Sequence, residues 1–131
     1  MSMGIIENGA YKQVAGNVPL QTTYSTEETK TGATWIDGKP VYRRVFTNLP
    51  ISSTWSQHTV DNSSQDSLVS YTILGKSGVS GNTHTTPYFD GTGDNFQVAV
   101  VVGAGSLNYW GSASTITAFD MVVEYTKTTD A

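Results

Sequence analysis

Apolar and polar residues alternate with a period of two along several short stretches of this chain. Runs of this kind cover residues 31–37, 40–47, 54–60, 67–75, 95–103, 106–111 and 115–127, and clusters of Gly, Asn, Asp and Ser separate them. No stretch of ten or more residues keeps the spacing of three and four that marks an amphipathic helix. Because successive side chains of a strand point to opposite faces, the pattern predicts about seven to nine strands.

The composition agrees with strands. Gly, Ser, Thr and Asn are abundant, whereas the strong helix formers are scarce. The 131 residues are enough for one domain with its own core. We therefore predict an all-β fold, an antiparallel β-sandwich of jelly-roll-like form, over residues 19–131. Residues 1–18 are less clearly patterned, and we expect a linker or an added arm there.

The three longest runs also predict how the side chains divide between the two faces of a strand. In residues 115–127 one face is apolar and the other carries Asp120 and Glu124, so the apolar face is expected to meet the core. Its members are Phe119, Met121, Val123 and Tyr125. In residues 95–103 the corresponding face holds Phe96, Val98, Val100 and Val102. In residues 67–75 one side of the strand holds Val69, Tyr71 and Ile73.

Asp37 and Gly38 lie between two alternating runs, and this pair is typical of a tight hairpin turn. A two-residue loop at 37–38 pairs Trp35 with Pro40, and a loop at 38–39 pairs it with Tyr42. Either register predicts the same two faces. One holds Ala33, Trp35, Tyr42, Arg44 and Phe46, and the other holds Thr34, Ile36, Val41, Arg43 and Val45.

We expect the second of these faces to be aliphatic core. Trp35 and Phe46, on the first face, are also expected to be buried, because large aromatic side chains usually contribute to burial. Tyr42 and Arg44 would then lie at the rim, with their polar ends in water. The alternative is that the row of rings, with Arg44 among them, stacks on a ligand.

Two blocks of the sequence point to a family. Residues 24–46 begin with Tyr-Ser-Thr-Glu-Glu and continue through Trp-Ile-Asp-Gly-Lys-Pro-Val-Tyr to a basic pair, and residues 122–130 contain Glu-Tyr-Thr-Lys-Thr. These blocks resemble the opening and the ending of a domain found at the C-terminal ends of phage and prophage tail-fibre or minor structural proteins. The resemblance covers about residues 20–130. Residues 85–87 depart from the family's usual Trp-Tyr-Pro-Leu-Pro strand.

The resemblance implies a β-sandwich adhesion module at the tip of a tail fibre. Such a module is part of the virion and acts outside the cell, is expected to be a homotrimer, and contacts a glycan or a protein receptor on the bacterial surface. The resemblance supplies no catalytic residues.

Charge and composition argue against several other partners and kinds of chemistry. Charged residues make up 14% of the chain and the net charge is −4, so no nucleic-acid partner is expected. The chain has no Cys, which excludes disulfides and thiol nucleophiles. No apolar run approaches the roughly 20 residues that span a bilayer, so no membrane insertion is expected.

The sequence also contains few of the residue patterns that are typical of an enzyme active site. His58 and His84 are the only histidines, and no Gly-x-Ser-x-Gly motif accompanies them. Asp90, Asp94 and Asn95 offer oxygens for Ca²⁺, but without the ligand order of a known calcium loop. No pair of carboxylates has the context of a glycosidase. We therefore predict a non-enzymatic protein with no metal and no cofactor.

Candidate ligand-binding residues are aromatic or histidine side chains in turns and near strand ends, together with the rim pair of the hairpin. They are Trp55, His58, His84, Tyr88, Tyr109, Trp110, Tyr42 and Arg44. Adjacent strand residues point to opposite faces, so one of Tyr109 and Trp110 should be exposed, and we expect it to be Trp110, which is next to Gly111. The alternative is that this pair belongs to a hydrophobic contact between subunits or sheets. Two other functions stay open: a structural domain that trimerises or caps a fibre, and a polysaccharide hydrolase.

Overall fold

The computed structural model describes residues 4–7, 10–13, 23–76, 83–89 and 95–130. Among these residues there are ten strands and no helix. The strands are β1 (Gly4–Glu7), β2 (Ala10–Gln13), β3 (Thr29–Thr34), β4 (Pro40–Pro50), β5 (Ser56–Lys76), β6 (Thr83–Thr85), β7 (Tyr88–Phe89), β8 (Asn95–Gly103), β9 (Gly105–Ala113) and β10 (Ala118–Lys127).

All strand pairs are antiparallel, so the predicted all-β antiparallel class is confirmed. β1 and β2 pair only with each other, within the predicted arm, and the predicted boundary near residue 18 lies outside the described residues. The other strands form one sheet in the order β3-β4-β10-β5-β9-β8-β7, with β6 on β5. The finer likeness to a jelly roll stays a prediction.

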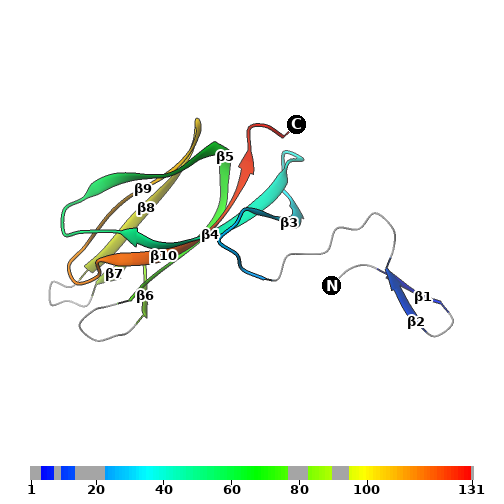
Figure 1. Ribbon diagram of the computed structural model, residues 1–131, viewed down its shortest axis with the longest axis horizontal. Coiled ribbons are helices and arrows are strands. Elements are labelled where there is room, and N and C mark those ends of the chain that lie inside the picture. Colours follow the sequence, from blue (N-terminus) through cyan, green and yellow to red (C-terminus); the bar gives the residue numbers. More distant parts are fainter. Residues whose placement is uncertain (1–3, 8–9, 14–22, 77–82, 90–94, 131) are drawn as a thin grey trace.

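One long strand, β5, belongs to both halves of this sheet. Its residues 56–65 pair with β9, and its residues 65–75 pair with β10. Figure 1 shows β5 bending between these two stretches. The pairing with β9 shifts register after Thr59 and again after Asp61, and Ser64 has φ 71°. Irregular pairing of this kind bends a strand and increases its twist.

The bend lets the two halves of the sheet face each other as layers. We call residues 56–65 with β9, β8 and β7 the β9 layer, and residues 65–76 with β10, β4 and β3 the β10 layer. The Phe119 ring of β10 meets Tyr109 of β9 edge-on at 5.0 Å and Phe96 of β8 at 5.8 Å. The predicted buried face of β10 is confirmed, since its four members are at most 2% exposed.

The layers approach closely beside these rings. A Cβ atom on Gly75 would lie 2.8 Å from the Phe96 ring, so a side chain larger than hydrogen would push the layers apart. Val98, Val100 and Val102 pack against the same core, as the alternation predicts. The core therefore lies between the layers and draws on both.

The hairpin between β3 and β4 differs from both predicted registers. The Trp35 amide donates to the Lys39 carbonyl at 2.8 Å, and the Gly38 amide donates to the Trp35 carbonyl at 2.9 Å. The loop thus has three residues, and Gly38 closes it with φ 89°, where glycine is favoured. Trp35 opposes Lys39 instead of Pro40 or Tyr42.

The extra loop residue changes which side chains share a face. Tyr42, Arg44 and Phe46 do lie together, because they pair with Tyr125, Val123 and Met121 on the core side of β10. Phe46 packs on the core as predicted. Of the other face, which is expected to be aliphatic core, only Val41 is fully buried, at 2% exposed. Ile36 lies in the loop and is 91% exposed, and Arg43 pairs with Glu124.

Replacing Phe119 tests the contact between the layers. We expect Phe119→Ala to lower the free energy of unfolding by about 3–5 kcal/mol, because it leaves a cavity between two buried rings. Ile36→Ala removes an exposed side chain and should change the stability by less than about 0.5 kcal/mol. Urea denaturation followed by circular dichroism measures both, and equal effects would contradict the assignment of the core.

Candidate ligand-binding face

The outward side of the β9 layer carries an exposed tryptophan among small and polar residues. In the register of the sheet, Trp110 lies between Gln57 of β5 and Ala99 of β8. The next row holds Thr59, Asn108 and Val101. Trp110 is 41% exposed and Val101 is 51% exposed. We call the following set the outer face of the β9 layer: Gln57, Thr59, Gln97, Ala99, Val101, Asn108, Trp110 and Ser112.

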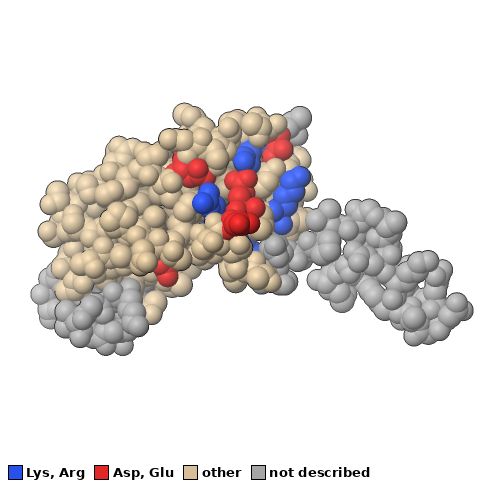
Figure 2. Space-filling view, in the orientation of Figure 1, with Lys and Arg blue, Asp and Glu red and all other residues tan. Residues whose placement is uncertain are grey.

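This outer face has no charged residue. Residues 51–60 and 95–119, which build most of the β9 layer, contain no Asp, Glu, Lys or Arg. On the side of the molecule in Figure 2, most charged side chains gather away from β8 and β9. The signal was present in the sequence as two charge-free stretches, but only the register shows that they form one surface.

Several polar groups of the outer face are already ordered. The Thr59 hydroxyl donates to Asn108 Oδ1 at 2.7 Å, and the Asn108 amide donates to Ser106 Oγ at 2.9 Å. The Asn108 side chain is therefore held in one orientation beside Trp110. A flat ring with fixed polar groups at its side is suited to a neutral polar ligand.

A small pocket opens where this outer face meets the β10 layer. Its volume is about 210 Å³, and its lining is uncharged. The lining residues are Trp55, Tyr71, Thr86, Pro87, Gln97 and Val98. Trp55 and Tyr71 are both about half exposed, at 50% and 47%. Gln97 belongs to the outer face and also to the pocket, so the two are continuous.

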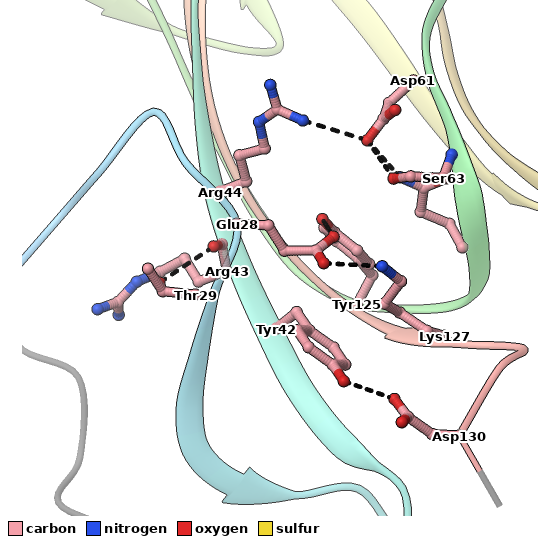
Figure 3. Close-up of polar contacts among 11 residues, drawn as sticks. Glu28, Thr29, Tyr42, Arg43, Arg44, Asp61, Ser63, Tyr125, Lys127 and Asp130 are labelled. Carbon is pink, nitrogen blue, oxygen red and sulfur yellow. Dashed lines mark hydrogen bonds and ion pairs between the residues drawn. The ribbon is translucent and has the colours of Figure 1, made fainter.

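The two residues predicted at the rim of the hairpin, Tyr42 and Arg44, lie in a polar cluster on the inward side of the β10 layer (Figure 3). The Tyr42 hydroxyl donates to Asp130 at 2.8 Å, and its ring stacks on Tyr125 at 6.3 Å between centroids. Arg44 donates to the Thr26 carbonyl at 2.8 Å and forms an ion pair of 3.4 Å with Asp61. Both side chains are engaged within the protein rather than turned to a ligand.

The carboxylates of this cluster are occupied in the same way. Tyr125 and Lys127 donate to the two oxygens of Glu28. Asp61 Oδ2 accepts hydrogen bonds from Ser63 and from Gln65, which is fully buried. A buried network whose members satisfy one another makes a structure rigid. We therefore assign the cluster a structural role, which ties the segment before β3 and the end of β10 to the sheet.

The predicted ligand-binding residues thus separate into groups. Trp55 and Trp110 lie on one uncharged surface, as ligand contacts require. Tyr109 is 1% exposed and donates to the Pro50 carbonyl, so its assignment to the ligand is corrected: it is a core residue. The His58 ring stacks on Tyr109 at 4.9 Å, on the core side of β5.

The remaining two candidates have only a described backbone. His84 lies in β6 opposite Gly75, and Tyr88 lies in β7 opposite Phe96, while their side chains are outside the described residues. Asp90 and Asp94 of the possible calcium loop also lie outside them. Sequence reasoning missed Tyr71, Gln57 and Gln97, because nothing in their local pattern separates them from ordinary strand residues.

The outward side of the β10 layer has a different character. A groove of about 280 Å³ is lined there by Tyr24, Thr72, Leu74 and Val122. Tyr24 is 64% exposed and Leu74 39%. Arg43 lies over the Tyr24 ring at 4.5 Å and pairs with Glu124 at 3.5 Å. This groove is apolar but has charged neighbours, unlike the outer face of the β9 layer.

Within the described part of the chain, no group of three or more His, Cys, Asp or Glu side chains is placed to hold a metal ion. The same residues include no helix with the length and hydropathy to cross a membrane.

Comparison of the chain with protein-family models, with curated proteins and with solved structures finds no match.

Three tyrosines have a pKa above the ordinary value. Burial raises the pKa of Tyr109 to about 12. Burial, and then the hydrogen bond to Asp130, raises the pKa of Tyr42 to about 12. Burial and the hydrogen bond to Glu28 also raise the pKa of Tyr125. The folded protein thus keeps these three phenols protonated at pH values where the same phenols of the unfolded chain lose their protons.

Stability should therefore fall at alkaline pH. The contribution of Tyr42 and Tyr109 is fully present below pH 10 and is lost as the pH rises from about 10 to 12. Urea denaturation in steps of about one unit from about pH 8 to about pH 12 measures this loss of stability. Tyr109→Phe should make the decline shallower, because its titrating hydroxyl is gone, and a decline as steep as in the wild type would contradict the assignment.

Proposed function

We propose that this chain is a non-enzymatic adhesion module that binds neutral glycan on the bacterial surface through the outer face of the β9 layer. The observation that carries the proposal is the exposed Trp110 ring at the centre of a surface without charged residues. A sugar ring has an apolar side, which packs on an aromatic ring, and hydroxyl groups at its edge, which need hydrogen-bond partners.

The residues around Trp110 supply such partners. Gln57 lies beside it in the register, and Asn108 lies two residues before it on β9 with its amide held by Ser106. The absence of charge from the outer face also matters. A charged side chain covered by a neutral ligand would lose its hydration without a compensating partner, which costs free energy. This outer face therefore favours a neutral ligand over an anionic one.

The resemblance of residues 24–46 and 122–130 to tail-fibre domains supplies the biological setting. In our proposal the chain is the tip of a phage tail fibre, part of the virion, and acts outside the cell. It assembles as a homotrimer, so three weak sites act together on one bacterial surface. Linked sites bind much more tightly than a single site, even without new contacts.

The groove on the β10 layer supports the assembly. Leu74 and Val122 offer apolar surface on adjacent strands, and Tyr24 covers one side of it. Exposed apolar surface of this kind is typical of contacts between proteins. We propose that a second copy of the chain packs here. The same groove also favours the second candidate function, a structural domain that trimerises a fibre and binds no glycan itself.

A cell-binding assay tests the adhesion. Fluorescently labelled chain is applied to a panel of intact bacterial cells, and Trp110→Ala is expected to lower the affinity for cells that bind at least about tenfold, or about 1.4 kcal/mol. Ile36→Ala, an exposed apolar side chain of the hairpin loop, is the control and should bind as the wild type does.

Two results would contradict the adhesion. Absence of binding to every strain would favour the structural role. Binding that Trp110→Ala leaves unchanged would exclude the outer face of the β9 layer as the adhesive surface.

Light scattering tests the assembly. We expect the mass of three chains of 14.1 kDa each, and Val122→Asp is expected to give a lower mass, because a buried unpaired charge would destabilise the interface. Val101→Asp places the same charge on the outer face of the β9 layer and should leave the mass unchanged. A wild-type mass of one chain would overturn the homotrimer.

A further inference from the structure

We propose that the pocket formed by Trp55, Tyr71, Pro87 and Gln97 is a second sugar subsite, which holds one neutral pyranose ring next to the Trp110 subsite. The inference rests on the proposed glycan adhesion and deepens it. It states that the protein recognises an oligosaccharide rather than a single sugar, with one ring on Trp110 and another in the pocket.

Two large aromatic side chains define the pocket although they come from different layers. Trp55 lies directly before β5, and Tyr71 lies in the second half of β5, which belongs to the β10 layer. Each is about half exposed, at 50% and 47%. Aromatic surface that folding leaves in water beside a concavity is available to a ligand. The volume of about 210 Å³ is below the usual range for drug-sized ligands, and it suits a single ring.

One wall of the pocket is held in place before any ligand arrives. The Thr86 hydroxyl donates to the Phe96 carbonyl at 3.3 Å and accepts from the Val98 amide at 3.0 Å. These two bonds fix the Thr86-Pro87 segment on β8, beside Gln97 and Val98. A wall that is already ordered loses little conformational entropy on binding, so even a small ligand can bind measurably.

The polar groups of the pocket are uncharged and unused. Among the described residues, no hydrogen-bond partner occurs for the side-chain amide of Gln97, the hydroxyl of Tyr71 or the indole N–H of Trp55. Together they provide donors and acceptors for sugar hydroxyls. The lining contains no carboxylate and no basic group. The chemistry therefore selects a neutral hexose or N-acetylhexosamine over a uronic acid or sialic acid.

The pocket is also in register with the Trp110 subsite. Gln97 pairs with Ser112, and Ala99, two residues further along β8, pairs with Trp110. Two residues of an antiparallel strand span about 7 Å. Neighbouring sugar rings of one chain can therefore reach both subsites along the outer face of the β9 layer.

The three tryptophans make a direct experiment possible, because each indole gives its own NMR signal. ¹⁵N-labelled protein is titrated with the methyl glycosides of glucose, galactose, N-acetylglucosamine and glucuronic acid. We expect at least one neutral glycoside to shift the Trp55 indole signal to saturation, with a Kd on the order of 10 mM. The Trp35 signal, from the hairpin, should not move. The glucuronide should bind at least about tenfold more weakly.

Variants decide whether the pocket itself binds. Gln97→Glu keeps the shape of the side chain and adds a charge, so it should weaken binding of the neutral glycoside at least about tenfold. Tyr71→Ala should abolish the Trp55 shift. Ile36→Ala, an exposed residue in the hairpin loop between β3 and β4, is the control and should not change it. Circular dichroism of each variant must match the wild type.

The outcomes separate this inference from the adhesion. No Trp55 shift with any neutral glycoside, or an equal shift with the glucuronide, overturns the pocket. Cell binding that depends on Trp110 but is unchanged in Tyr71→Ala and Gln97→Glu also overturns it, while the adhesion stands. A saturable Trp55 shift, lost in Tyr71→Ala, supports the pocket even if the chain binds to no cells in the panel, a result that would overturn the adhesion alone.

Discussion

The ring of Phe119 packed against Tyr109 and Phe96 is the contact on which the rest of the structure depends. It joins β10 to β9 and β8. In the sheet β10 is next to neither of these strands, and without this contact it would have no reason to face them. The two layers share β5, so the chain can bury both apolar sides only by bending that strand. Close packing of the rings then fixes the distance between the layers, and Gly75 shows how little space is left.

This arrangement divides the protein into regions of different polarity. The end of β10 and the segment before β3 are joined by ion pairs and hydrogen bonds around Glu28, Tyr125 and Lys127. The charge-free stretches that pair in β5, β8 and β9 instead form one surface with Trp110 at its centre. Charged groups thus stabilise the fold at one end, and the uncharged surface is left for recognition. The proposed subsites follow from this separation.

The hairpin shows where reasoning from pattern stops. The Asp37-Gly38 pair does mark the turn, but pairing in a strand has a period of two, so one additional loop residue moves Trp35 to the other face relative to Tyr42. The pair Tyr109 and Trp110 is the converse case. Alternation alone requires that one be buried and one exposed, and in β9 the smaller ring points inward, where its hydroxyl reaches the Pro50 carbonyl.

From the sequence alone, the class of fold, the buried face of β10 and the presence of one exposed ring in the pair Tyr109 and Trp110 could be determined, because each depends on alternation along a strand. The bend of β5, the three-residue loop and the role of Tyr71 were decided by the tertiary structure. Tyr71 and Ile73 share one side of β5, yet Ile73 is buried and Tyr71 borders a pocket with Trp55. What lies opposite a side chain depends on the layer that folds over it, and no local pattern contains that contact.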